Sequence, residues 1–284
     1  MSDAILRFAP FDAGAVKVLL CDADGNLFPS EQPAFVASAR VTNEMLADLG
    51  IGRRFAPDRL RRRAVGRNFR ATALELAAEA GMTIEPDELE RRVLQERREV
   101  VAHLASVLRP DPAVLEPLRA LAASYELAVV SSSASDRLDA CFRATQLDAL
   151  VAPDKRFSAE DSLPLPTSKP DPAIYRFAAE RLGISGAAGL AVEDAAAGAR
   201  SAVAAGFRTV GNLQFVAAGE RRAAIAALRD AGVVAIVSSW RQLRELLTAD
   251  APPSAPGGCG AEDPGRARRA DRGYFSLKAL MRSA

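Results

Sequence analysis

The chain has 284 residues, of which 49% are apolar, and its formal net charge is +1 at pH 7. This length suits one large domain or two modest ones, and the near-neutral charge gives no reason to expect nucleic acid or an anionic membrane as a partner. The cysteines are odd in number and far apart, which fits a reducing compartment rather than a disulfide framework or a zinc site. No signal peptide or membrane-spanning run is expected, so the prediction is a cytoplasmic protein.

Residues 1–14 read as a loosely ordered lead-in, and the apolar run from Val16 to Cys21 then predicts a buried strand. That strand ends in Asp22-Ala23-Asp24-Gly25-Asn26, which places two carboxylates at its carboxyl end. Gly25 allows the backbone to turn sharply there. Because ligands of open α/β sheets bind at the carboxyl ends of strands, this turn is a candidate site, although an ordinary acidic turn is the alternative interpretation.

The next stretch has the apolar spacing of helices almost throughout. Helices are expected at about 35–49, 57–63, 69–80 and from Glu85 to near Pro110. So much helix after a single strand predicts a small helical domain over residues 29–108, inserted into a core domain formed by residues 1–28 and 109–248. Residues 249–284 are rich in Pro, Gly, Ala and Arg and are predicted to form a disordered tail.

From Pro112 onward, strand and helix patterns alternate, which predicts a parallel sheet with helical crossovers. Strands are expected at 127–130, 150–151, 189–192, 207–210 and 233–237. Helices are expected at 115–123, 136–145, 173–182, 195–205 and 241–247. A polar loop is expected over residues 153–168. The predicted fold class is therefore α/β, with a Rossmann-like parallel sheet and an inserted helical domain.

Polar residues follow several of these strands. Ser131, Ser132 and Ser133 end the second strand, Glu193 and Asp194 end a later one, and Lys169 precedes the helix that leads to it. If the strands are parallel, these groups and the first acidic turn gather at one edge of the sheet. Clustered carboxylates repel one another unless a cation lies among them, and oxygen ligands of this kind suit Mg²⁺. Lysine and serine can donate to phosphate oxygens, so the pattern predicts a Mg²⁺-dependent phosphate site.

Taken in order, these motifs resemble those of the haloacid dehalogenase superfamily. The matching residues are Asp22-x-Asp24-Gly25, Ser131 after an apolar strand, Lys169-Pro170-Asp171-Pro172, and Glu193-Asp194 with Gly198 and Ala204-Ala205-Gly206. The resemblance covers about residues 15–247. The helical segment is similar to the C1 cap of the β-phosphoglucomutase-like and phosphoglycolate phosphatase-like branch.

The resemblance implies a role for each residue of the motifs. Asp22 would attack phosphorus and form an aspartyl-phosphate, and Asp24 would act as general acid and then base. Ser131, Ser132 and Lys169 would hold the phosphoryl oxygens, with Ser133 in support. Mg²⁺ would be bound by Asp22, by Asp194 with Glu193 beside it, and by the backbone carbonyl of Asp24. The expected enzyme is a phosphatase of small phosphorylated molecules, such as sugar phosphates or phosphoglycolate, and a monomer or homodimer.

Asp24 separates activities within the resemblance, because dehalogenases and phosphonatases lack an acid at this place. The mutase-like members have a His soon after the first motif, where this chain has Gln32-Pro33-Ala34-Phe35. A mutase and a binding module without turnover remain the alternatives. Receiver domains and dinucleotide-binding enzymes do not fit the first turn.

The expected cap is the place to look for substrate contacts, because caps close over such sites. Its basic stretch includes Arg67, Asn68 and Arg70, which are tentative substrate contacts, although a solvated helix face is the simpler explanation for most of this charge. The chain also departs from the usual motifs: Asn26 stands in place of Thr, and Ala195 in place of Ser or Asp.

Overall fold

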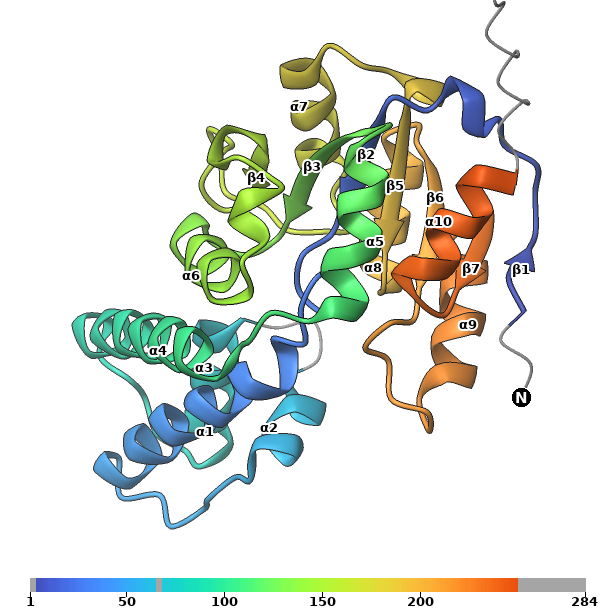
Figure 1. The fold of residues 1–284 in the computed structure, drawn as a ribbon. Coiled ribbons are helices and arrows are strands. Elements are labelled where there is room, and N and C mark those ends of the chain that lie inside the picture. The colour runs from blue at the N-terminus through green and yellow to red at the C-terminus, as the bar shows by residue number, and fades with distance from the viewer. Residues whose placement is uncertain (1–3, 65–67, 250–284) are drawn as a thin grey trace, which may run out of the picture. The chain divides into compact units, whose positions relative to one another are not determined.

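The computed structural model describes residues 4–64 and 68–249, and its central element is a seven-stranded sheet in the order β1-β7-β6-β5-β2-β3-β4 (Figure 1). Its strands are β1 (Leu6–Arg7), β2 (Val18–Cys21), β3 (Glu126–Ser131), β4 (Arg156–Ser158), β5 (Gly189–Glu193), β6 (Arg208–Asn212) and β7 (Ala235–Val237). Neighbouring strands run parallel except β1, which pairs antiparallel with β7. The predicted parallel-sheet fold class is confirmed.

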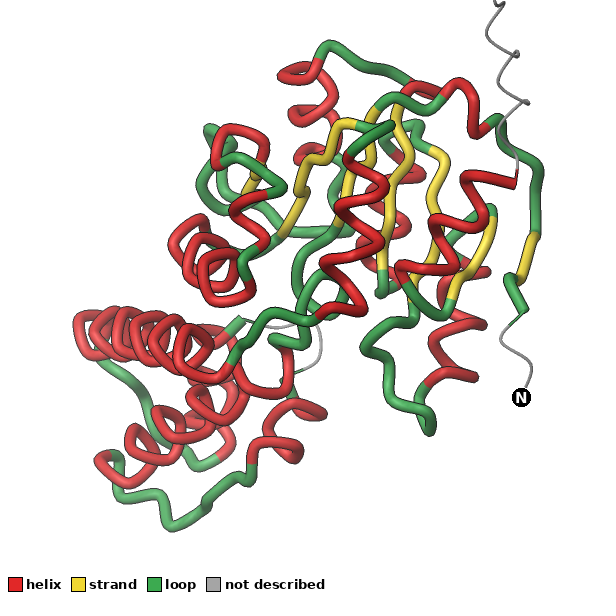
Figure 2. The backbone as a smooth tube through the Cα atoms, viewed as in Figure 1, coloured by secondary structure: helices red, strands yellow, loops and turns green. Residues whose placement is uncertain are grey.

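Helices cover both faces of the sheet, as the strands between helices in Figure 2 show. Along β2, Leu19 and Cys21 join one apolar cluster, and Val18 and Leu20 join another, because successive side chains of a strand point to opposite faces. The first cluster includes residues of α5 (Pro112–Ala122), α6 (Ser135–Thr145) and α10 (Trp240–Ala249). The second includes residues of α7 (Ala173–Leu182) and α8 (Ala196–Ala204). Helix α9 (Arg221–Asp230) packs with α8 and the sheet through Leu228.

The chain between β2 and α5 forms a helical insertion made of α1 (Glu31–Asp48), α2 (Pro57–Arg63), α3 (Phe69–Glu79) and α4 (Pro86–Val107). Local signals start these helices: the Asn68 side chain caps α3 by accepting from the Ala71 N–H at 2.9 Å, and Pro86 begins α4 with acids in its first turn. The insertion has an apolar cluster of its own, which includes Met45, Leu60 and Leu76. The division into core, cap and tail stays a prediction, and residues 250–284 lie outside the described part of the chain.

Several predicted elements were wrong. Residues 150–151 are not a strand, because the Leu150 N–H closes a turn onto the Leu147 carbonyl. The strand that pairs with β3 is β4, which lies inside the expected 153–168 loop. The lead-in contains β1, and α9 was not foreseen, since only Leu228 of that helix is buried. No helix within residues 4–64 and 68–249 is long and apolar enough to cross a membrane.

The strand order places the candidate site. Strand β2 lies between β3 and β5 and is parallel to both, so the carboxyl ends of these strands meet at one edge of the sheet. The chain passes from β2 to β3 on one side and later to β5 on the other, which makes this edge a topological switch point, where α/β sheets bind ligands.

Candidate active site

Asp22 directly follows β2, and the turn after it fixes its position. Its N–H donates to the Val192 carbonyl at 2.9 Å, and Asn26 Nδ2 donates to its carbonyl at 3.0 Å. The Asp22 residue is 7% exposed. Gly25 has a φ of +80°, and a Cβ there would lie 2.3 Å from Asp194 Oδ2. A glycine is therefore required at this position both by the backbone conformation and by the close approach of Asp194.

Lys169 reaches the same point from the loop before α7. Its Nζ donates to Asp22 Oδ1 and Glu193 Oε1, both at 2.6 Å, and to the Val130 carbonyl at 2.8 Å. Burial acts to lower the pKa of Lys169, but Asp22 and Glu193 outweigh this effect and raise it. Lys169 is therefore charged, and each of its three ammonium hydrogens has an acceptor.

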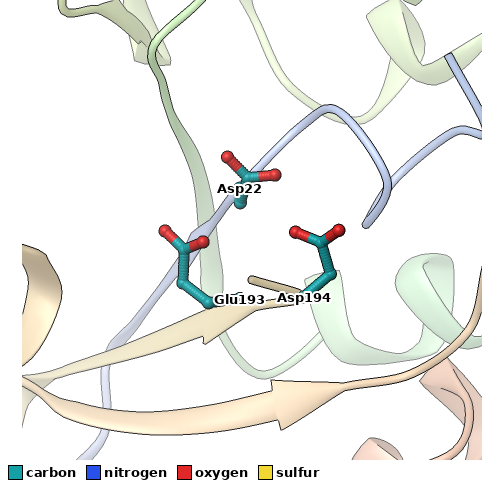
Figure 3. A group of neighbouring side chains, drawn as sticks. All are labelled: Asp22, Glu193 and Asp194. Atoms are coloured by element: carbon teal, nitrogen blue, oxygen red, sulfur yellow. The ribbon is translucent and has the colours of Figure 1, made fainter. Parts of the chain in front are cut away.

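Three acidic side chains, Asp22, Glu193 and Asp194, gather at this point, as Figure 3 shows. Lys169 bonds to the first two. Each of the three acids offers an oxygen within 4.8 Å of those of the other two. Burial raises the pKa of all three acids, and repulsion from neighbouring carboxylates adds to it, so that the pKa of Glu193 is about 7 and that of Asp194 lies well above its usual range. A single lysine cannot balance three carboxylates.

This donor set fits a divalent cation such as Mg²⁺. The three groups are hard oxygen ligands that lie close together, and a divalent cation would offset the repulsion among them that helps to raise their pKa values. Of the predicted metal ligands, the structure brings together the carboxyl groups of Asp22, Glu193 and Asp194. Asp24, predicted to contribute its backbone carbonyl, directs its carboxyl group to other partners.

The Asp24 carboxylate is held by three donors. Arg137 Nη2 donates to its Oδ1 at 2.6 Å, Ser30 Oγ donates to the same oxygen, and Ser133 Oγ donates to Oδ2 at 2.7 Å. Burial acts to raise the pKa of Asp24, but Arg137 and the two hydroxyls outweigh it and lower the pKa. In this arrangement Asp24 is ionised, and both of its oxygens accept hydrogen bonds.

The predicted serine cluster forms the loop after β3. Ser131 is 1% exposed, and its Oγ accepts from the Ser133 N–H at 3.0 Å. Ser132 Oγ accepts from the Lys169 N–H at 3.0 Å, which ties this loop to the loop that carries the lysine. The structure thus places all three serines at the same sheet edge as Asp22 and Lys169.

Two residues that contact the site were not identified from the sequence. The Tyr175 hydroxyl donates to Glu193 Oε1 from within α7, and Arg137 pairs with Asp24 from α6. Tyr175 lies on the buried face of its helix, where a tyrosine reads as an ordinary core residue. Neither position carries a local signal, because each contact joins two different elements, 113 positions apart for Arg137 and Asp24 and 18 positions apart for Tyr175 and Glu193.

Asn26, in place of the usual Thr, has its own buried partners. Its Nδ2 also donates to the Val192 carbonyl at 3.0 Å, and its Oδ1 accepts from Asn212 Nδ2 at 2.9 Å. Trp240 Nε1 donates to the Asn26 carbonyl at 2.9 Å. These bonds connect the catalytic turn to β6 and α10, so the substitution is accommodated without an unpaired polar group on Asn26.

The tentative substrate contacts are not brought to the site by any observed contact. Arg67 lies outside the described residues. Asn68 caps α3, and Arg70 Nη2 donates to Glu90 Oε2 at 2.8 Å. The contacts of Asn68 and Arg70 described here lie within the helical insertion, and their role toward a substrate stays a prediction.

Gly198 in α8 makes room for Glu193. A Cβ at position 198 would lie 1.8 Å from Glu193 Oε2 and 2.2 Å from its Cδ. We expect Gly198→Ala to displace the Glu193 carboxylate, to cost about 1–3 kcal/mol of stability and to lower activity at least tenfold. Gly219→Ala is the control, because a Cβ there meets nothing within 4 Å. Equal thermal melting and activity of the two variants would contradict this account of Gly198.

The comparisons with known proteins agree with this geometry. A family model for haloacid dehalogenase-like hydrolases matches residues 16–206, most of the chain. The protein belongs to this family. Another haloacid dehalogenase-like protein, (S)-2-haloacid dehalogenase 4A of Burkholderia cepacia, is 40% identical over 77 residues. That match spans 27% of this chain and only 30% of the Burkholderia enzyme.

Solved structures of this family share the fold. A predicted phosphoglycolate phosphatase from Haemophilus somnus aligns with a TM-score of 0.65 and 21% identity, covering 82% of this chain and 98% of its own. A HAD family hydrolase from Deinococcus radiodurans, solved with bound phosphate and sodium, aligns with a TM-score of 0.59 and 27% identity, covering 86% and 97%. The family model thereby confirms the predicted superfamily, and the assignment to a branch within it stays a prediction.

Proposed function

We propose that this hydrolase is a Mg²⁺-dependent phosphatase of small phosphomonoesters that works through an aspartyl-phosphate. The observation that carries the proposal is Asp22 at the end of β2, bonded to Lys169 and facing Glu193 and Asp194, with a second acid at Asp24. The Deinococcus neighbour was solved with phosphate, and the Haemophilus neighbour is described as a phosphatase, which supports phosphoryl chemistry.

The proposal gives a role to each group. Lys169 holds Asp22 Oδ1, so Oδ2 is the oxygen that attacks phosphorus while the bond to the leaving oxygen breaks. Glu193 Oε1 already accepts from Lys169 and Tyr175, so Asp22 and Asp194 would hold Mg²⁺ directly, with Glu193 beside them. Mg²⁺, when bound, neutralises charge on the carboxylates and the phosphoryl oxygens.

The remaining residues orient the phosphoryl group and move protons. Ser131 Oγ would donate to a phosphoryl oxygen, and the Lys169 ammonium would do so in exchange for one of its present acceptors. Because Asp24 is ionised in the present arrangement, it would first take a proton from solvent as it leaves Arg137. It would then give this proton to the leaving oxygen and take one back from the water that hydrolyses the aspartyl-phosphate. To do so, its carboxyl group must exchange its present partners for the substrate. The helical insertion would act as the cap that excludes water.

Dehalogenation is the competing activity, since the Burkholderia relative is a haloacid dehalogenase. Displacement of halide from carbon needs no general acid, whereas an ester oxygen does, and Asp24 supplies one. A mutase reaction is less well supported, because this chain lacks the His that mutase-like members have soon after the first motif. A cytoplasmic location and a monomeric or homodimeric state remain predictions.

The decisive experiment measures phosphate release from a panel of small phosphomonoesters, with Mg²⁺ and with EDTA, alongside halide release from 2-haloacids. We expect phosphate release that depends on Mg²⁺ and no halide release. Halide release without phosphate release would replace the proposal by a dehalogenase. Binding of phosphomonoesters with no turnover would support the binding module instead.

A further inference from the structure

Arg137 lies at the side of the candidate site, in the first turn of α6. Its guanidinium is 2.6 Å from Asp24 Oδ1, and the side chains of Arg137 and Asp24 keep 25% and 21% of their surfaces exposed. The pair is therefore reachable from solvent, unlike Lys169, whose side chain is 6% exposed. A ligand entering the site can touch Arg137.

The guanidinium has more donors than its observed partner uses. An arginine carries five N–H groups, and Asp24 accepts from Nη2. Arg137 Nε is buried and has no hydrogen-bond partner among the described residues. Because Nε is buried, a ligand would bind to the Nη groups, of which Nη2 has the observed acceptor among the described residues. These groups leave N–H donors for a further acceptor.

Asp24 cannot act as the general acid and remain the charged partner of Arg137 at once, because a carboxyl group that protonates the leaving oxygen is neutral before the transfer. In the present arrangement it is ionised and accepts from Arg137 and Ser30 on one oxygen and from Ser133 on the other. When the carboxyl group is protonated and turns to the substrate, Arg137, whose side chain is only 25% exposed, loses its acidic partner. A partly buried charge left alone is unfavourable, which creates a demand for a new anion.

The other acids nearby are poor replacements. Asp136 is already paired with Arg97 at 2.8 Å. Glu96 of the helical insertion lies within electrostatic reach of Arg137, but burial raises its pKa, and Ser38 is its hydrogen-bond partner. A group on the substrate itself can supply the missing charge.

We propose that Arg137 is a specificity-determining residue that binds a second anionic group of the substrate, a carboxylate or a second phosphate, in exchange for Asp24. The inference rests on the proposed phosphatase function and narrows its substrate class. It assigns the preference to a residue of the core rather than to the basic stretch around Arg67 and Arg70. Arginine suits such groups because its planar fork can bind them with two hydrogen bonds.

The test compares substrates that differ only in the second group. One pair is 2-phosphoglycolate and ethylene glycol monophosphate, in which a carboxylate replaces a hydroxymethyl group. The other is the bisphosphate and the monophosphate of propane-1,3-diol. We expect the wild-type enzyme to prefer the member with the second anionic group, in at least one pair, by tenfold or more in kcat/KM. The difference should lie mainly in KM. A preference within the first pair would indicate a carboxylate, and one within the second pair a phosphate.

Arg137→Met should abolish this preference, and Arg137→Lys should keep part of it. Arg143→Met, an exposed position on the same helix, should leave the preference unchanged. If the wild type turned over both members of each pair equally, the inference about Arg137 would be wrong, while the proposed phosphatase function would stand. An equal loss on both members in Arg137→Met, with the preference retained, would also overturn it and show that Arg137 only positions Asp24. No turnover of any phosphomonoester would overturn the proposed function and the inference with it.

Discussion

Asp22→Asn is expected to lower phosphate release by about 10⁴-fold or more, because the amide cannot attack phosphorus. Asn has the same shape and can still accept from Lys169 through its side-chain oxygen. The fold should therefore be kept, and the residual rate should come from the donors that remain, Ser131 and Lys169. The measurement is kcat on the best substrate of the panel at saturating Mg²⁺.

The matched control is Asp111→Asn. Asp111 caps α5 by accepting from the Ala113 N–H, and none of the site contacts described above involves it. This variant should keep wild-type turnover and lose at most about 1 kcal/mol of stability, since Asn also caps helices well. If Asp22→Asn retained more than a tenth of wild-type activity in a correctly folded preparation, Asp22 would not be the nucleophile.

Lys169→Met is expected to cost about 3–5 kcal/mol of stability at neutral pH, in addition to activity. The ammonium is buried and bonds to Asp22, Glu193 and the Val130 carbonyl, so its removal leaves the carboxylates without the cation that offsets their repulsion. Denaturant unfolding in EDTA measures this effect without metal.

The loss of stability in Lys169→Met should grow as pH rises. Lys169 lowers the pKa values of Asp22 and Glu193, yet that of Glu193 is still about 7, so without the lysine both must rise further. A raised acid pKa means that the folded chain binds more protons than the unfolded chain, and stability then falls as pH rises between the unfolded and folded values. The deficit of Lys169→Met should therefore be small near pH 5 and largest near pH 8.

Lys155→Met is the control for this series. Lys155 forms an ion pair with Glu126 at 2.6 Å, but both side chains are exposed by a third or more. Such a surface pair contributes about 0–1 kcal/mol, so this variant should show little change across the same pH range. Equal losses in the two lysine variants would show that burial of Lys169 does not govern its contribution.

Much of the fold follows from patterns that are local in sequence. The apolar run before Asp22 and the glycine after Asp24 specify a strand and a sharp turn, and Pro86 and Asn68 start helices where predicted. Parallel strands joined by helices bring their carboxyl ends to one edge, which is why Asp22, Ser131, Lys169 and Glu193 could be grouped before any coordinates. The wrong strand at 150–151 shows the limit, because a short apolar pair carries no information on which segment pairs with β3.

The sequence by itself determined the fold class, the family motifs and the acids, lysine and serines that gather at the sheet edge, since these depend on periodicity and on the order of elements along the chain. Only the tertiary structure decided the partners of those groups: Arg137 and Ser30 on Asp24, Tyr175 on Glu193, and Asn212 and Trp240 on the turn at Asn26. Most of these contacts join residues that are more than a hundred positions apart in the sequence. They depend on how helices pack on the sheet, and burial there sets the pKa values on which catalysis depends.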